Sequence, residues 1–308
     1  MGRFLLRRLG MGLLTVFVSS IAVTLLIHLV PGDPVQIMYA QSQGTTPEQI
    51  EAIRHSLGLD LSIPEQYLRF VGRLAQGDLG VTVRGQQPVL GLLMQRLPNT
   101  LALSVSAMMV ALLIGVPLGF LAAARRGGWL DAGLMALVMV GISIPSFWLG
   151  LVLLFFFAVQ LQWLPVTGNG PLNLVLPALT LGLANAAVFA RITRSAMIDA
   201  MQEDFVRTAH AKGLPEATVL HRHALRAGLL PIVTIMGMQF AYMMGGAIVV
   251  ENIFAWNGIG RLAIEAIFQR DYPVIQGFIL VFATVVAVVS MLLDIAYALL
   301  DPRVRRAV

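Results

Sequence analysis

Six long apolar segments determine what this chain can fold into. The first is an uncharged run over Leu9–Val30, and the others are Leu101–Ala124, Leu134–Val159, Leu174–Ala190, Leu229–Val250 and Val274–Leu293. Each segment holds 17–26 residues, which lets a helix cross the ~30 Å of hydrocarbon in a bilayer. The sequence therefore predicts an all-α integral membrane protein with six transmembrane helices.

Composition and charge agree with this fold class. Charged residues make up 12% of the chain, against about 25% in a soluble domain. With the N-terminus in the cytoplasm, 14 of the 21 Lys and Arg residues fall in four inner regions, 1–8, 125–133, 191–228 and 300–308. This follows the positive-inside rule and places both termini in the cytoplasm. The net charge of +5 comes from Arg residues that flank apolar segments, so it predicts no nucleic-acid partner.

The first segment has one alternative interpretation, a cleaved signal peptide. Its apolar run is too long for such a peptide, and no small-x-small cleavage pattern follows it. We therefore expect residues 1–30 to be the cytoplasmic N-terminus and a retained first helix. Residues 31–97 form an external loop region, and residues 98–308 form a five-helix core with a cytoplasmic loop over 191–228.

The external region contains helix and turn signals. Thr46 is positioned to cap a helix that starts at Pro47, and a second helix is expected near Pro64. Glycines between residues 77 and 85 predict turns, which flank a short strand over Val81–Val83. This region is either a solvated cap or a docking surface for a substrate-binding protein.

The chain lacks the groups that would drive transport or catalysis. Two acids, Glu251 and Asp294, lie in or beside the apolar segments of the core. Both are near segment ends, where we expect headgroups and water to reach them. The sole lysine, Lys212, precedes Gly213, so no G-x-x-x-x-G-K-[ST] phosphate loop exists. There is no H-E-x-x-H, no G-x-S-x-G and no cysteine, and we predict no catalytic residue, no metal site and no cofactor bound by this chain. Any energy source must then be a partner protein.

The polar stretch over residues 191–231 is predicted to be a helix, a tight turn and a second helix. Met197, Met201, Phe205 and Ala209 recur every four residues and indicate one amphipathic helix. Glu203 and Arg207 stand at the spacing of a helical ion pair. Gly213 then stops the first helix, and a second short helix runs from about Glu216 to Arg226, ahead of Pro231. Three interpretations are a solvated loop, a docking element for a soluble partner and a DNA-binding helix-turn-helix. The last is weak because acids nearly balance bases.

Residues 204–231, DFVRTAHAKGLPEATVLHRHALRAGLLP, resemble the cytoplasmic EAA-type coupling loop of ABC-importer permeases, in the form found in di- and oligopeptide permeases. In the general EAA loop an acidic-Ala-Ala triplet stands at a fixed distance before the glycine. Here Arg207-Thr208-Ala209 occupies those places, so the acidic residue's role does not transfer.

Other parts of the chain carry the same resemblance. E-x-I-F-x-x-x-G-x-G-x-L at 251–262 is similar to a family segment near the external gate, and it leads into an amphipathic stretch from Ile259 to Ile267. Pro145-Ser146-Phe147-Trp148 resembles a segment along the translocation pathway, where a proline kink makes a natural bend point. The pathway and gate residues that the resemblance implies are Pro145, Ser146, Phe147, Glu251, Phe254 and Gly258. Other breakers in the spans, such as Gly115, are expected to serve close helix packing.

The resemblance implies the pore-forming permease subunit of an ATP-driven importer in a bacterial inner membrane. Its expected partners are a second, non-identical permease subunit, two ATPase subunits that bind ATP and Mg²⁺, and an extracytoplasmic binding protein that delivers di- or oligopeptides. The expected ATPase-coupling interface is Glu203, Asp204, Arg207, Thr208, Ala209, Ala211, Lys212, Gly213, His223 and Arg226. Alternatives are the same type of permease for nickel, glutathione or another small solute, and a membrane assembly or sensor protein that recruits a soluble partner without transport.

Overall fold

The computed structural model describes residues 2–29, 48, 51, 54–55, 60–83, 85–168 and 170–300. These residues are helical apart from short connections, and they include one isolated antiparallel bridge between Val81 and Pro88. The predicted strand over Val81–Val83 is therefore wrong, because a single bridge does not extend into a ladder. The helix predicted from Pro47 lies almost entirely outside the described residues.

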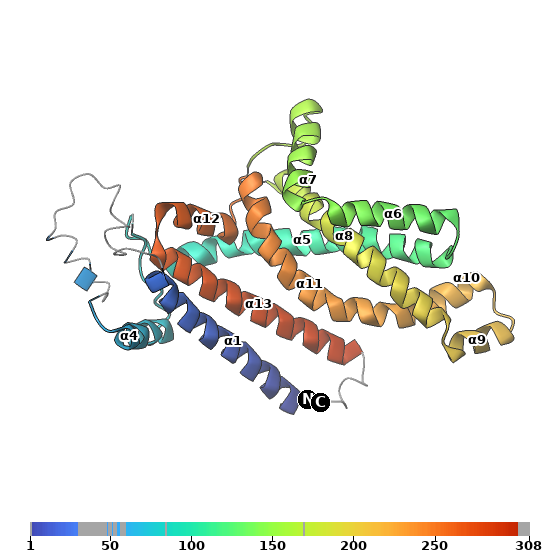
Figure 1. The fold of residues 1–308 in the computed structure, drawn as a ribbon, viewed down its shortest axis with the longest axis horizontal. Coiled ribbons are helices and arrows are strands. Elements are labelled where there is room, and N and C mark those ends of the chain that lie inside the picture. The colour runs from blue at the N-terminus through green and yellow to red at the C-terminus, as the bar shows by residue number, and fades with distance from the viewer. Residues whose placement is uncertain are drawn as a thin grey trace. The chain divides into compact units, whose positions relative to one another are not determined.

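The chain divides into two compact units, one of residues 1–98 with 258–291 and one of residues 99–257 with 292–308. In the first unit, α1 runs beside α13, and α4 lies near one end of α1 (Figure 1). The helices wholly or partly in this unit are α1 (Gly2–Leu29), α4 (Ile63–Ala75), the start of α5 (Val89–Ala124), α12 (Ile259–Gln269) and α13 (Tyr272–Leu300).

Two polar contacts hold α1 in the first unit. The hydroxyls of Ser20 and Tyr67 lie 3.0 Å apart and join α1 to α4, and Nε2 of Gln276 donates to the carbonyl of Val23 at 3.5 Å. The start of α4 confirms the helix predicted near Pro64. There, the carboxylate of Glu65 accepts bonds from the backbone N–H (3.1 Å) and the hydroxyl (2.7 Å) of Ser62, and the first of these is the Glu65 half of a capping box.

Helix α12 confirms the amphipathic stretch predicted in the last external loop. Ile259, Leu262, Ala263 and Ala266 are buried. Ile267, which we placed on the same face, is 55% exposed, so the buried face of α12 ends at Ala266.

The second unit contains the rest of α5 from residue 99 and the remaining helices, with α8 lying between α6 and α11 and α9 at one end (Figure 1). They are α6 (Trp129–Ser143), α7 (Ser146–Leu153), the π-helical η1 (Leu154–Gln160), α8 (Pro171–Met201), α9 (Asp204–Ala211), α10 (Glu216–Thr218), the π-helical η2 (Val219–Ala224) and α11 (Leu225–Ile253).

Close packing between α5 and α8 depends on glycine. A Cβ atom at Gly115 would lie 2.5 Å from the carbonyl oxygen of Ala186, and one at Gly119 would overlap the carbonyl oxygen of Ala190. Since contacts this short do not occur, any side chain at either position would push the two helices apart. This supports the predicted packing role of these glycines.

The number of spans agrees with the sequence. Within the part of the chain that the structure describes, five helices are long and apolar enough to cross a membrane, and the bent pair α6 with α7–η1 makes a sixth if it is counted as one span. The third apolar segment differs from a simple span, because its two halves meet at 98°. The bend lies at Pro145, as the predicted bend point requires. Pro145 has no N–H to continue the helix, and Ile144 before it is extended (φ −77°, ψ 122°).

Candidate functional site

The first candidate site is the polar connection between α8 and α11. The structure breaks the single amphipathic helix that we predicted here. Helix α8 ends at Met201, and Glu203 adopts an extended conformation (φ −70°, ψ 149°) before α9 begins at Asp204. The break changes the helical phase, so Phe205 is 42% exposed instead of sharing the buried face of Met197.

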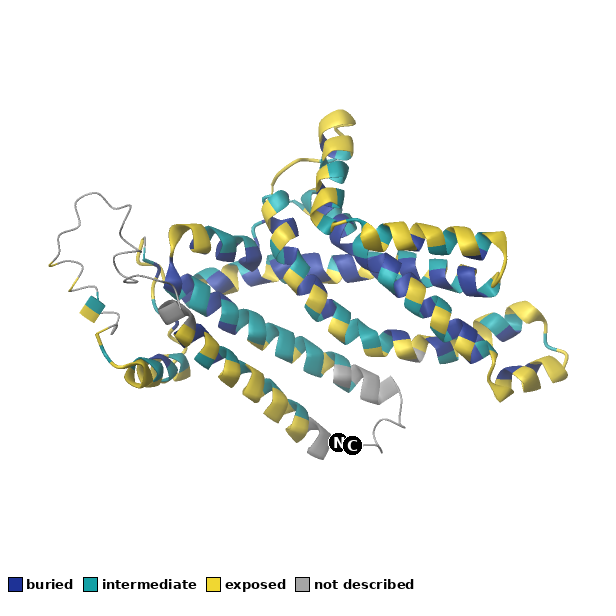
Figure 2. Ribbon diagram, viewed as in Figure 1, coloured by how far each residue is buried: buried dark blue, intermediate teal, exposed yellow. Residues whose placement is uncertain are grey.

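Helix α9 buries a narrow face of its own. Val206 and Ala209 pack with Val219 of η2 in a small apolar cluster, and Leu214 packs against its edge. We call this the α9 cluster. The opposite side of α9 is exposed (Figure 2). The helix therefore lies on η2 by one side and presents the other side outward.

A Schellman cap ends α9. The N–H of Gly213 donates to the carbonyl of His210 at 2.9 Å, and the N–H of Leu214 donates to that of Ala209 at 3.4 Å. This pair of bonds needs a left-handed residue between helix and turn, and Gly213 has φ +74°. The predicted stop at Gly213 is confirmed, and Leu214 supplies the hydrophobic contact that accompanies the motif.

The predicted interface residues separate into three groups by exposure. Most are exposed on or beside α9, and the structure places at the surface Glu203, Asp204, Arg207, Thr208, Ala211, Lys212, Gly213 and Arg226. His223 is half-buried, and Ala209 is only 4% exposed. The side chain of Ala209 packs inside the α9 cluster and does not face outward, so its place in the interface stays a prediction.

The ionic contacts of α9 also differ from the prediction. Arg207 lies 3.5 Å from the carboxylate of Asp204, while the expected pair with Glu203 does not form because Glu203 lies before the first helical residue. Nε2 of His210 is 2.8 Å from the carboxylate of Glu216 and so links α9 to α10 across the turn.

The second helix of the connection does not stop before Pro231. Helices α10, η2 and α11 follow one another without a break, and Pro231 lies inside α11. We predicted a separate short helix here, and that prediction is wrong. A proline inside a helix removes one hydrogen bond and kinks the helix. Helix α11 is long and packed against its neighbours, and it accommodates Pro231 without ending. Continuous helical backbone therefore joins η2 to α11.

A larger apolar cluster joins this connection to the helices of the second unit. Its buried members come from the ends of α5 and α8 and from η2, namely Ala123, Met197, Ile198, Ala200 and Ala224. The ring of His221 also lies against that of Phe120, with centroids 4.7 Å apart. Among the described residues, no group of three or more His, Asp or Glu could hold a metal ion.

Sequence reasoning missed a buried ion pair next to this cluster. Nε and Nη2 of Arg194 on α8 donate to the two carboxylate oxygens of Asp131 at 2.6 and 2.7 Å. Asp131 is 5% exposed, and the N–H of Gly127 donates to it at 3.0 Å. The pair joins the first turn of α6 to α8. The available signal was that Asp131 is the sole acid between Asp78 and Asp199.

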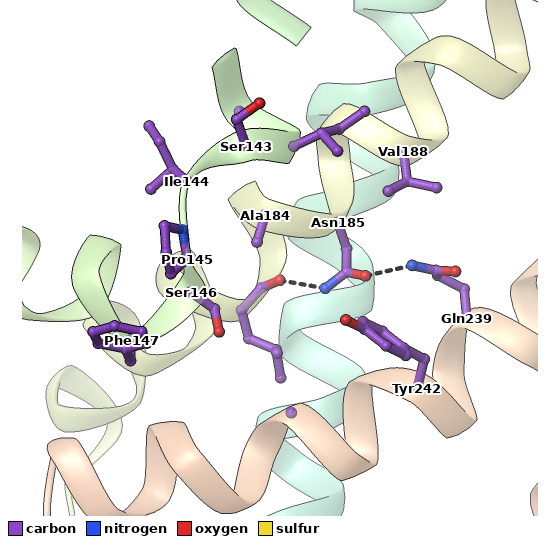
Figure 3. Close-up of a pocket in the computed structure, with 14 residues that line it drawn as sticks. Ser143, Ile144, Pro145, Ser146, Phe147, Ala184, Asn185, Val188, Gln239 and Tyr242 are labelled. Carbon is purple, nitrogen blue, oxygen red and sulfur yellow. Dashed lines mark hydrogen bonds between the residues drawn. The ribbon is translucent and has the colours of Figure 1, made fainter. Parts of the chain in front are cut away.

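The second candidate site is a pocket of about 510 Å³ at the break between α6 and α7. The predicted pathway residues Pro145, Ser146 and Phe147 line one side of it. Asn185 of α8 and Gln239 of α11 line the other sides and are hydrogen-bonded to each other (Figure 3). Sequence reasoning did not find these two residues, although each is an isolated amide within an apolar segment.

The predicted gate residues Glu251 and Phe254 lie at the end of α11. We expected water to reach Glu251, but its side chain is fully buried, and the hydroxyl of Thr100 donates to its carboxylate at 2.5 Å. Phe254 is 4% exposed. The position of Glu251 near the end of an apolar segment does not bring it to the surface, because α5 covers it. Gly258, also predicted at the gate, is the extended residue before α12 (φ −101°, ψ −179°).

The fold is similar to those of solved ABC transporters. The inward-facing MetNI methionine ABC transporter matches with a TM-score of 0.60 at 17% identity, over 69% of this chain and 97% of the other. A structure titled an amino acid ABC transporter with histidines matches with a TM-score of 0.52 at 19% identity, over 69% and 94%. At these identities the likeness shows the fold.

Sequence comparisons cover nearly the whole chain. The glutathione transport system permease protein GsiC of Pectobacterium atrosepticum is 41% identical, and the di/tripeptide transport system permease protein DppB of Pseudomonas aeruginosa is also 41% identical, each over 98% of both chains. Residues 115–306 match the family described as binding-protein-dependent transport system inner membrane component, and residues 1–104 match its N-terminal family. The chain therefore belongs to the inner-membrane permease subunits of binding-protein-dependent ABC importers.

Proposed function

We propose that this permease imports short peptides, and that α9 with η2 receives the motion of an ATPase subunit on the cytoplasmic side. The observation that carries the proposal is the way α9 packs on η2. Its exposed side is free to contact a partner, while its buried side lies on Val219 of η2, which continues directly into α11.

The substrate class follows from the relatives and from the pocket. Two relatives at 41% identity are named for di/tripeptide and glutathione transport, and both substrates contain peptide amides. The pocket at Pro145 is lined by neutral side chains, without a charged residue. This composition suits an uncharged peptide backbone better than a metal cation such as nickel, which takes nitrogen or carboxylate ligands.

The proposed complex contains this chain, a second and non-identical permease subunit, two ATPase subunits and an extracytoplasmic binding protein. ATP and Mg²⁺ would be bound and ATP hydrolysed by the ATPase subunits. Closure of those subunits would push α9, move α11 through η2 and open the pore outward to receive a peptide. The N- and C-termini and the 191–228 connection would lie in the cytoplasm.

Uptake by the reconstituted complex tests the function. Proteoliposomes with the four membrane-associated subunits and the binding protein should accumulate labelled dipeptides, tripeptides or glutathione only with ATP on the ATPase side. Uptake without ATP, or ATP hydrolysis that a loaded binding protein does not stimulate, would contradict the proposal.

Labelling of introduced cysteines tests the orientation. Since the chain has no cysteine, Thr208→Cys on α9 and Gln76→Cys after α4 each give a single labelling site, and both positions are exposed. A membrane-impermeant maleimide added to intact cells should label Gln76→Cys and leave Thr208→Cys unlabelled until the membrane is opened. The reverse pattern would contradict the proposed topology.

A further inference from the structure

The pocket between α6, α7, α8 and α11 has a definite hydrogen-bonding character. Nδ2 of Asn185 donates to the main-chain carbonyl of Leu181 at 2.7 Å, which makes Oδ1 of Asn185 the acceptor. Nε2 of Gln239 donates to that oxygen at 2.5 Å, so the amide orientation of Gln239 is fixed as well. Asn185 is 3% exposed and anchors the pair in the helix packing.

The Asn185–Gln239 pair still offers hydrogen bonds to a ligand. One N–H and the carbonyl oxygen of the Gln239 amide have no partner among the described residues. Tyr242 lies three residues after Gln239, on nearly the same side of α11, and is 71% exposed. Its hydroxyl points toward the Asn185 side of the pocket, and the hydroxyl of Ser146 lies on the α7 side (Figure 3).

The broken helix adds main-chain groups to the same pocket. Pro145 has no N–H, so the carbonyl of Gly141 loses its helical donor. At the start of α7 the first helical bond is made by the N–H of Leu149 to the carbonyl of Pro145, at 3.0 Å. The N–H groups of Ser146 and Phe147 precede that bond and have no helical acceptor. The side of the pocket formed by the α6–α7 break therefore offers both hydrogen-bond donors and acceptors.

Such groups restrict what can lie against them. The break falls near the middle of the apolar segment 134–159, and unpaired backbone groups at membrane depth are tolerated only where they are buried in protein or line a water-filled cavity. Discontinuous helices of this kind form substrate sites in other transporters. A lipid chain would leave the main-chain groups and the Gln239 amide unsatisfied, at a cost in free energy.

We propose that this pocket binds a main-chain amide of the transported peptide, with Gln239, Tyr242 and the broken-helix backbone as its hydrogen-bonding groups. An amide carries one donor and one acceptor and no charge, as the pocket requires. The volume of about 510 Å³ lies within the ~300–1,000 Å³ typical of small-molecule sites. This inference rests on the proposed peptide transport and assigns residues to substrate contact within the permease.

The test compares peptides in the assembled importer at saturating loaded binding protein. The probes are trialanine and its analogue methylated on an internal amide nitrogen, which keeps the chain but loses a donor. We expect the wild-type complex to transport trialanine about tenfold faster, the effect of roughly one hydrogen bond. Gln239→Leu should slow trialanine transport about tenfold and abolish the preference. Met238→Leu is the matched control, because Met238 is adjacent and 71% exposed but does not line the pocket.

Direct contact is tested by replacing Tyr242 with the photoreactive residue p-benzoylphenylalanine. Radiolabelled trialanine should then label the permease during turnover, and the same replacement at Met238 should give at most background. Equal labelling at the two positions, or a peptide preference that survives in Gln239→Leu, would overturn the inference while wild-type transport proceeds. If the wild-type complex transports neither trialanine nor glutathione, the proposed function itself fails, and this inference fails with it.

Discussion

Substitutions at Gly213 test whether the cap of α9 is needed to couple ATP hydrolysis to transport. Gly213 has φ +74°, and an added Cβ would meet nothing within 4 Å. The cost of Gly213→Ala is therefore conformational only, about 1–2 kcal/mol for a left-handed alanine. That cost corresponds to about a 5- to 30-fold rise in the equilibrium constant for opening of the cap. Gly213→Asn should cost less, because asparagine adopts this conformation more readily.

Gly213→Pro should be more severe for two reasons. Proline fixes φ near −65°, and it removes the N–H that donates to His210. The cap then cannot form, at a cost of about 3 kcal/mol or more, which is over about a hundredfold in the opening equilibrium. We expect the variant to reach the membrane and to hydrolyse ATP within the complex, with little peptide transported per ATP.

Gly77 supplies a matched control. It follows α4 with the same φ of +74° and open space around an added Cβ. Its cap also has the same two bonds, from Gly77 N–H to the carbonyl of Leu74 and from Asp78 N–H to that of Arg73, each 3.0 Å. Gly77→Ala should therefore strain α4 by the same 1–2 kcal/mol without changing the ratio of transport to hydrolysis.

Two measurements decide the prediction. Hydrogen exchange of peptides that cover residues 204–214 should accelerate in the order Asn, Ala, Pro, and peptide uptake per ATP should fall in the same order. The reasoning is refuted if Gly213→Pro keeps normal uptake per ATP, or if Gly77→Ala lowers that ratio as much as Gly213→Ala does.

Three further substitutions test the packing around the connection. Ala209→Asp places a charge in the α9 cluster and should destabilise α9 by at least about 3 kcal/mol and abolish peptide uptake by the proteoliposomes; normal uptake would contradict this. Asp131→Asn removes the charge of a buried, bidentate ion pair and should lower the free energy of unfolding by about 1–3 kcal/mol, measured by thermal unfolding in detergent; an unchanged midpoint would contradict this. Gly119→Ala, whose Cβ would overlap the carbonyl oxygen of Ala190, should cost about 1–3 kcal/mol in the same assay, and Gly245→Ala, with nothing within 4 Å, should change little.

Features that depend on local chemistry could be predicted from the sequence. The length and apolar composition of a segment determine whether it can span a membrane, and the five long helices and the bent pair found in the described residues agree with that expectation. The bend at Pro145 could be expected because proline has no N–H to continue a helix, although Pro231 lacks the same group and lies inside α11. Gly213 ends α9 because the turn needs a positive φ that other residues adopt at a cost.

Features that depend on phase or on distant partners could not be predicted. The prediction that Phe205 shares the buried face of Met197 was wrong. The extended residue Glu203 ends one helix before the next begins, and the periodicity of the first helix does not continue into the second. Glu251 is buried by Thr100, which lies 151 positions away in the chain. The partner of Asp131 is 63 positions away, and nothing in the local sequence indicates it.

The continuity of η2 with α11 connects the two candidate sites. Val219 in the α9 cluster and Gln239 at the pocket lie on one uninterrupted helical path, and 20 residues of helix span about 30 Å. Under the proposed coupling, a displacement of α9 would move Val219 through its small buried face, and the backbone would carry the motion to Gln239 without crossing a loop. The π-helical turn of η2 and Pro231 are the points on this path where the backbone departs from regular α-helix, and π-helical turns are frequent at functional sites. A push on α9 should therefore reach the wall that holds Gln239 and Tyr242 as a movement of that helix.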